Sequence, residues 1–165
     1  MFKNKILKIT ELIGKIKNDI TIPLISEFLD WFYENLYIHF KKSEPNHKYQ
    51  KGEIYFVNLG KNIGSELNKV RPCIIFSLKS YNNKSGVIII PIKSFKNKKI
   101  IDKFQVKIET SETNNLYKSS LVDIFYIRNI STKRINKYIG KLTKLEILEI
   151  DEKVSKMFGI KKIGN

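Results

Sequence analysis

The feature that most constrains the fold is a change in hydrophobic periodicity near residue 49. Before it, apolar residues recur every three or four positions, as at Ile6, Ile9 and Ile13, which is the spacing of an amphipathic helix. After it, apolar and polar residues alternate or form short β-branched runs such as 87–90, which is typical of strands. The sequence therefore predicts a helical segment over 1–48, including a linker, and a strand-rich domain over 49–165.

The first segment has the pattern of a helical hairpin. One amphipathic helix is expected from residue 2 to about residue 20, and a second begins with Pro23 in its first turn and continues to about Phe40. Trp31 and Tyr33 widen the apolar stripe of the second helix beyond one ordinary helix face. We expect this hairpin to pack on the rest of the chain, on a second copy or on a partner.

The second segment predicts a small antiparallel barrel with a helix at its end. Turn-forming residues separate short strands, expected at 53–59, 71–79, 86–93, 103–109 and 119–127. Thr143 and Glu146 form a capping box, Leu142 and Ile147 a hydrophobic staple, and Gly159 suits the helix end. The stripe expected to dock this helix on the barrel is Leu145, Leu148, Val154 and Met157. The predicted class is mainly β with helices (α+β).

The charge of the chain favours a polyanionic partner. Against 16 acidic residues there are 31 Lys and Arg, and 23 of the basic and ten of the acidic residues fall in 49–165. A lysine-rich surface that keeps a protein in solution is the alternative reading. The three arginines, Arg71, Arg128 and Arg134, also lie in this segment, and only arginine offers a planar bidentate fork to a phosphate.

Several classes of function find no support in the sequence. Cys73 is the single cysteine, and His39 and His47 lie in the helical segment or linker, so we expect no metal or other cofactor. Nucleophile elbows, phosphate loops and dinucleotide fingerprints are absent. No apolar run approaches the roughly 18–20 residues that span a bilayer, so a cytoplasmic protein without a membrane partner is expected.

What remains is a basic domain with a polar loop at 60–69 that leads to Arg71 and Pro72. This arrangement suits a phosphate group. RNA carries its own nucleophile in the 2′-hydroxyl, so cleaving it requires a proton acceptor, a proton donor and cations that stabilise the charge on phosphorus. No metal is needed for that reaction.

The motifs of this segment, in their order and spacing, resemble the MazF/PemK family of toxins from type II toxin–antitoxin systems. The resemblance covers roughly 50–160. It rests on the segments 52–55, 62–66, Arg71-Pro72, 81–86, 87–92, 120–122 and 127–128, and on the C-terminal helix that ends at 157–160.

The resemblance implies an SH3-like (CcdB/PemK-type) barrel that forms a homodimer and binds a cognate antitoxin protein. It also implies an endoribonuclease that cuts single-stranded RNA at short sequences without a metal and leaves 2′,3′-cyclic phosphate and 5′-hydroxyl ends. In the family, the arginine of the Arg-Pro pair acts at the scissile phosphate as proton donor or charge stabiliser, a role that carries to Arg71. A structural ion pair is the alternative for Arg71.

The second catalytic position of the family is usually a threonine, and here the sequence differs. Lys93 takes the place of that threonine and Ser94 follows it, so either a hydroxyl one residue later or a lysine charge could serve. Gln105 falls near a histidine that some relatives carry. The loop borders the RNA groove in relatives, which predicts RNA contacts for Lys61, Ser65, Glu66, Asn68 and Lys69.

Two other functions remain open on the same fold. The first is a non-catalytic module that binds RNA or protein, which the residues Lys93 and Gln105 would suit. The second is a gyrase-binding toxin of the CcdB type, whose activity depends on residues near the chain end. The last residues of this chain, 161–165, give that reading no support.

Overall fold

A computed structural model of the chain describes residues 2–15, 21–42, 48–82, 86–96 and 102–160. Backbone contacts divide the chain into two compact units, Met1–Phe40 and Lys41–Asn165. The first unit contains two helices, and the second contains the strands and a C-terminal helix. Among the described residues, α1 and α2 thus precede every strand along the chain.

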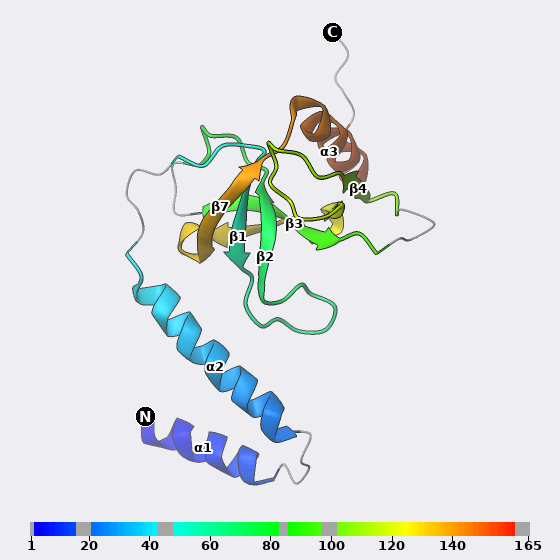
Figure 1. The fold of residues 1–165 in the computed structure, drawn as a ribbon. Coiled ribbons are helices and arrows are strands. Elements are labelled where there is room, and N and C mark those ends of the chain that lie inside the picture. The colour runs from blue at the N-terminus through cyan, green and yellow to red at the C-terminus, as the bar shows by residue number, and fades with distance from the viewer. Residues whose placement is uncertain (1, 16–20, 43–47, 83–85, 97–101, 161–165) are drawn as a thin grey trace. The chain divides into compact units, whose positions relative to one another are not determined.

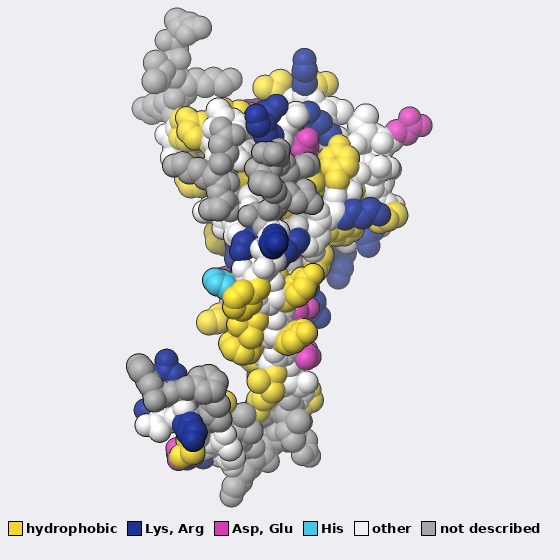
Figure 2. Space-filling view, turned by 90° about the vertical axis from the view of Figure 1, so that its left-hand side faces the viewer, with side chains coloured by type: hydrophobic (Ala, Val, Ile, Leu, Met, Phe, Trp, Pro, Cys, Tyr) yellow, Lys and Arg dark blue, Asp and Glu magenta, His cyan; other side chains and the backbone are white. Residues whose placement is uncertain are grey.

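The first unit consists of α1 (Phe2–Gly14) and α2 (Thr21–Phe40), which confirms the two predicted helices. The expected end of the first helix, at residues 16–20, lies outside the described residues. Large apolar side chains remain exposed along α2, as the yellow side chains in Figure 2 show, and they include Phe32, Tyr33, Tyr37 and Phe40. None of the described helices is long and apolar enough to cross a bilayer.

The second unit is built on an antiparallel sheet of seven strands (Figure 1). Six strands run in the order β4-β5-β3-β2-β1-β7, and β6 pairs with β3. β6 and β7 lie on opposite sides of the row β3-β2-β1, yet the three-residue 3₁₀ turn η2 (Thr132–Arg134) joins them, so the sheet must curl back on itself. The strands are β1 (Glu53–Asn58), β2 (Val70–Ile75), β3 (Gly86–Ser94), β4 (Gln105–Ile108), β5 (Ser120–Asp123), β6 (Arg128–Ser131) and β7 (Ile135–Lys141).

The central strands are buried on both faces, which explains their continuous apolar runs. In β3, Ile90 and Ile92 contribute to one core, whereas Val87 and Ile89 contribute to the other. The first core also takes in the C-terminal helix, and the second fills the curl of the sheet together with Leu59 and residues of β1, β2, β6 and β7. Because successive side chains of a strand point to opposite faces, one run of isoleucines supplies two cores.

The first four predicted strands are confirmed with slightly different ends, but the prediction of one strand over 119–127 is wrong. β5 ends at Asp123, and Ile124–Tyr126 form the 3₁₀ turn η1 before β6 begins at Arg128. β6 and β7 were not predicted. β7 buries only Ile135 and Gly140, half-buries Ile139 and exposes its remaining residues, so it carries no clear strand pattern.

The C-terminal helix α3 (Lys144–Met157) begins and ends as its sequence predicts. The Thr143 hydroxyl accepts a hydrogen bond from the Glu146 backbone, and the Glu146 carboxylate accepts one from the Thr143 backbone. At the other end Gly159 has a φ of +66°, and Ile160 N–H donates to the Ser155 carbonyl at 2.8 Å, which is a Schellman motif.

The predicted docking stripe of α3 is partly wrong. Leu145 and Leu148 are exposed. The residues that pack on the first core instead follow a spacing of three and four residues, namely Ile147, Ile150, Val154 and Met157. The staple position of Ile147 therefore sets the buried face of the helix, because the chain enters α3 through the buried Leu142.

A fully buried asparagine organises the loop between β4 and β5, which a backbone bond from Lys141 to Thr113 holds against β7. The Asn114 side chain donates to the Glu109 carbonyl at 2.8 Å and accepts from the backbone of Ser111 and Leu116. The backbone of this loop lies so close to Gly140 that a Cβ there would come within 2.6 Å of the Thr113 carbonyl oxygen. A side chain at position 140 would therefore have to displace the backbone of Thr113 and Asn114.

We expect Gly140→Ala to lower the free energy of unfolding by on the order of 2 kcal/mol, because overpacking against backbone cannot be relieved by a rotamer change. Urea unfolding measures this difference. Gly14→Ala is the matched control, since a Cβ at that position meets nothing within 4 Å. Equal stability of the wild type and Gly140→Ala would contradict the close approach of the loop.

Candidate active site

Arg71 lies at the start of β2, where the loop from β1 enters the sheet, and its Cα pairs with that of Val57. Its Nε–H donates to the carbonyl of Asn68 at 2.7 Å, and the side chain is partly buried. Among the residues that the structure describes, the hydrogen-bond partner of Arg71 is thus a backbone carbonyl and not a carboxylate. This bond fixes the guanidinium plane and leaves the donors on Nη1 and Nη2 for a ligand.

Hydrogen bonds hold the loop before Arg71, residues 59–69, together at its base and across its middle. Leu59 N–H donates to Lys69 O at 3.0 Å, and Lys69 N–H donates to Gly60 O at 2.8 Å. Asn62 donates from its side chain to the carbonyls of Leu59 and Leu67 and from its backbone to the Asn68 side chain at 2.7 Å. The loop is therefore an ordered support for the carbonyl that orients Arg71.

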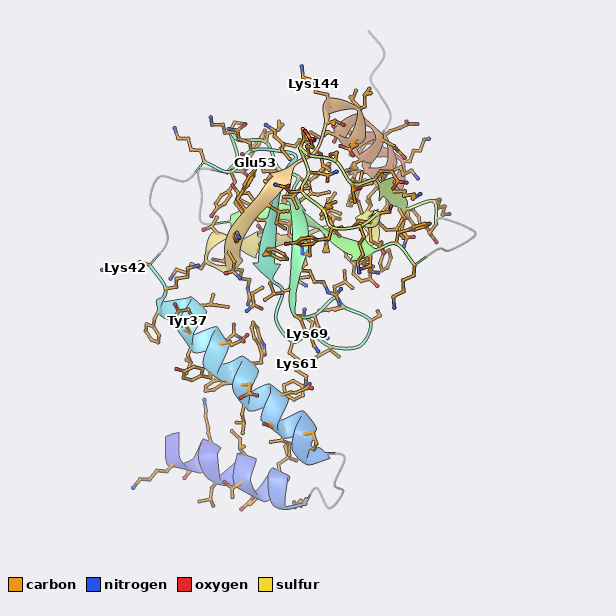
Figure 3. All side chains as sticks on the ribbon, viewed as in Figure 1. Tyr37, Lys42, Glu53, Lys61, Lys69 and Lys144 are labelled. Carbon is orange, nitrogen blue, oxygen red and sulfur yellow. The ribbon has the colours of Figure 1, made fainter. Side chains whose placement is uncertain are left out.

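The structure places the five predicted RNA-contact residues differently along this loop. Ser65, Glu66 and Lys69 are exposed, and Lys61 is partly buried. Figure 3 labels Lys61 and Lys69 on the loop between β1 and β2. The Asn68 side chain accepts the hydrogen bond from the Asn62 backbone. RNA contacts at these five positions stay a prediction.

Lys93, near the end of β3, is held by two side chains, and a third fixes one of these two. Its Nζ forms an ion pair with the buried carboxylate of Asp123 at 2.8 Å and lies 4.1 Å from the ring centroid of Tyr126. Gln105 Nε2 donates to the same Asp123 oxygen at 3.0 Å. The ammonium is thus fixed in position, and the carboxylate is satisfied by two donors.

Ser94 is the last residue of β3, and it is exposed. Its Cα pairs with that of Ser120 in β5. Because neighbouring strand residues point to opposite faces, the Ser94 hydroxyl and the Lys93 ammonium lie on different sides of the strand. The Asp123 network therefore acts on Lys93 rather than on Ser94.

The strand register relates Arg71 to Lys93. Cys73 of β2 pairs with Pro91 of β3, where the pairing of these two strands ends, and the same register continued by two residues would bring Arg71 level with Lys93. Side-chain alternation puts both on the side of the sheet that carries Cys73 and the second core. Two cations at the mouth of a core form a place where an anion is favoured.

Sequence reasoning missed two residues of this arrangement, Asp123 and Tyr126. The available signal was a carboxylate inside an otherwise apolar run at 121–127, because a buried acid requires a cationic or hydrogen-bonding partner. Within the described part of the chain, no group of three or more His, Cys, Asp and Glu side chains is placed to hold a metal ion.

The three arginines gather around the second core. Burial raises the pKa of the Cys73 thiol to about 12, although the charges of Arg128 and Arg71 act on it in the opposite direction. Arg134 donates from Nη1 to the Asn58 carbonyl at 3.3 Å, and burial together with the charge of Arg128 lowers its pKa. A region with this much positive charge is suited to a phosphate.

Comparisons with known proteins agree with this reading. Residues 50–158 match the model of a family described as the PemK-like, MazF-like toxin of type II toxin–antitoxin systems. The chain is 31% identical over 109 residues to the Endoribonuclease MazF9 of Mycobacterium tuberculosis, a match that covers 62% of this chain and 90% of that protein.

Solved structures show the same fold at low sequence identity. MazF from Deinococcus radiodurans superposes with a TM-score of 0.58 at 17% identity and covers 70% of this chain and 100% of that one. The M. tuberculosis toxin MazF-mt6 gives a TM-score of 0.52 at 18% identity over 66% and 98% of the two chains. An endoribonuclease from a mycobacterial species, solved with its cognate antitoxin, gives 0.55 at 17% over 68% and 96%.

The curled antiparallel sheet, with Arg71 near the start of β2, has the architecture of the barrel found in these toxins. The chain belongs to the PemK/MazF toxin family, since the family model spans most of it. The predicted resemblance and the α+β fold class are both confirmed.

We expect the buried thiol to make the protein less stable at high pH. The folded pKa of Cys73, about 12, lies above the ordinary value of a free thiol, 9.0, so the protonated thiol favours the folded state below pH 9, and this advantage is lost as pH rises towards 12. Relative to Cys73→Ala, the wild type should lose about 2 kcal/mol of unfolding free energy between about pH 8 and about pH 10.5. Urea unfolding at both pH values measures it, and equal losses in both proteins would contradict the buried thiol.

Proposed function

We propose that this chain is the toxin of a type II toxin–antitoxin system and that it acts as an endoribonuclease on single-stranded RNA. The observation that carries the proposal is Arg71, whose guanidinium is oriented by the Asn68 carbonyl at the mouth of a sheet that the family model spans. Its relative MazF9 is named an endoribonuclease. Single strands are favoured because their bases and phosphates are free to enter a site of this kind.

In the proposed reaction the 2′-oxygen of the RNA attacks the neighbouring phosphorus and the bond from phosphorus to the 5′-oxygen breaks. The proton of the 2′-hydroxyl is released, and the 5′-oxygen takes up a proton, so the products are a 2′,3′-cyclic phosphate and a 5′-hydroxyl. Arg71 donates to the phosphate oxygens as their charge grows, and Lys93 adds a second fixed cation. The nucleophile belongs to the substrate, so the step requires no metal.

The fixed position of Lys93 supports a role in charge stabilisation rather than in proton abstraction. An ammonium that is already paired with Asp123 cannot accept a proton, but it needs no reorganisation when negative charge builds up nearby. The exposed Ser94 hydroxyl is the alternative second group. We assign the contacts with nucleotides beside the cleavage site to Lys61, Ser65, Glu66, Asn68 and Lys69.

The remaining parts of the proposal concern assembly and place of action. We propose that residues 49–165 form the functional domain, that 1–48 are an appended helical segment, and that the domain acts as a homodimer that a cognate antitoxin neutralises. A related mycobacterial endoribonuclease has been solved with its antitoxin. Cellular RNA as substrate places the protein in the cytoplasm.

A non-catalytic RNA-binding module is the second candidate function. The observation that favours it is the Lys93–Asp123 ion pair at a position where the family usually carries a threonine. Binding without cleavage would then be the whole activity. The two candidates differ in a single measurement, which is whether purified protein shortens a long RNA.

We expect the wild type to cleave a long single-stranded RNA in the presence of EDTA and Arg71→Ala to lose at least about a hundredfold in rate, because the main stabiliser of the phosphate charge is gone. Gel analysis of the products measures the rate. Lys118→Ala, which removes an equal charge from an exposed position, is the control. Undiminished cleavage by Arg71→Ala would exclude this site, and intact RNA with the wild type would favour the binding module.

The second catalytic group can be identified by a pair of substitutions. If Lys93 supplies charge, Lys93→Met should lower kcat by about tenfold or more with a small change in KM, whereas Ser94→Ala should change neither. Lys93→Arg keeps the charge and should retain most of the activity. The opposite pattern, in which Ser94→Ala alone reduces kcat, would assign the role to the hydroxyl.

A further inference from the structure

Three lysine–aromatic pairs gather around the end of β3 and the strands beside it. Lys93 Nζ lies 4.1 Å from the ring centroid of Tyr126, and Lys107 Nζ lies 4.6 Å from that of Phe95. Lys103 Nζ lies 5.0 Å from the ring of Phe104, just before β4. We call Lys93, Phe95, Lys107 and Tyr126 the lysine–aromatic face.

The register of the strands explains why these side chains share one face. Lys93 of β3 and Lys107 of β4 both pair with Leu121 of β5, so the two lysines stand on either side of one residue. The alternate residues Ile92, Val106 and Val122 point into the first core. The lysines therefore point away from that core.

Phe95 and Tyr126 are attached to this face by fixed backbone. Phe95 N–H donates to Ser119 O at 3.1 Å, which continues the pairing of β3 and β5 by one residue. Tyr126 ends the turn η1, which follows β5 directly. Both rings are partly exposed. The neighbouring Phe125 ring is exposed and packs edge-to-face on Tyr126 with a centroid distance of 5.4 Å.

Each lysine of this face is held in place by an ion pair with one carboxylate, so the positive excess comes from the surrounding domain. Lys93 is paired with Asp123, and Lys107 forms an ion pair with Glu109, whose carboxylate also accepts from Ser119. The domain around them carries 23 basic against ten acidic residues over 49–165. A polyanion is thus attracted to the domain, and the ordered lysines leave the rings in defined positions.

Aromatic rings beside cations are the combination that binds single-stranded nucleic acid, because unstacked bases stack on the rings while phosphates meet the lysines. An acidic peptide would use the lysines but would have little use for the rings. Lys93 belongs both to this face and to the candidate active site. A strand of RNA that reaches Arg71 and Lys93 therefore has Phe95 and Tyr126 next to it.

We propose that Phe95 and Tyr126 form a base-stacking subsite for nucleotides that flank the scissile phosphate, with Lys107 holding the adjoining backbone. The subsite rests on the proposed function for its substrate, single-stranded RNA. It selects unstacked bases and tolerates different sequences, since every base has a π face.

The test measures binding separately from cleavage. A fluorescently labelled 2′-O-methyl RNA, which lacks the nucleophile, is titrated with the full chain and anisotropy gives Kd. We expect Phe95→Ala and Tyr126→Ala each to raise Kd by about five- to a hundredfold, the range of one lost stacked base. Phe95→Trp should retain binding, and Phe95→Leu should resemble Phe95→Ala. Tyr81→Ala, at an exposed tyrosine before the other end of β3, is the matched control and should leave Kd unchanged.

An oligonucleotide with abasic residues separates stacking from a structural effect. If the rings stack on bases, the wild type and Phe95→Ala should bind the abasic strand equally. If Phe95→Ala raised Kd by the same factor for abasic RNA as for normal RNA, the proposed subsite would be wrong. If Phe95→Ala does not fold, the comparison of normal and abasic RNA with the wild type decides, and equal affinity for both would also overturn it.

Two further outcomes distinguish the subsite from the nuclease. Base-dependent binding that requires Phe95, without cleavage of unmodified RNA, would support the subsite while the proposed enzyme failed. Cleavage of RNA together with unchanged RNA binding by Phe95→Ala and Tyr126→Ala would overturn the subsite alone. If Phe95→Ala weakened binding of labelled polyglutamate but not of RNA, the face would be a protein-binding surface and the proposal would be wrong.

Discussion

The burial of β3 on both of its faces is the constraint on which the rest of the domain depends. Its isoleucines and its one valine supply two cores, one that includes residues of α3 and one enclosed by the curl of the sheet. The strand is also shared between neighbours, since it pairs with β2 and β6 along one part and with β5 at its end. A polar residue in the middle of β3 would therefore disturb both cores together.

The candidate site lies where this two-sided burial stops. Polar residues enter β3 at Lys93, and Arg71 is the second residue of β2, before the side chains of that strand become buried. The ends of the strands provide exposed positions on a backbone that the cores hold rigid. Such positions suit charge stabilisation, because fixed cations require no reorganisation when a phosphate gains charge.

Different devices fix the two cations of the site. A loop carbonyl orients Arg71, and a buried carboxylate with an aromatic ring orients Lys93. The first device leaves the guanidinium charge uncompensated, whereas the second balances the ammonium. Arg71 is for this reason the stronger attractor of an anion, and Lys93 links the site to the rings of the lysine–aromatic face.

The sequence alone determined the two N-terminal helices, the first four strands, the limits of α3 and the family, because periodicity, caps and motifs are local signals. It also singled out Arg71, Lys93 and Ser94. Tertiary structure decided what local patterns do not contain. η1 interrupts a run that reads as one strand, β7 is a strand despite its polar residues, and Leu145 and Leu148 face solvent because Ile147 and Ile150 meet the core. Asp123 reaches Lys93 through pairing between residues 30 positions apart, which no local pattern encodes.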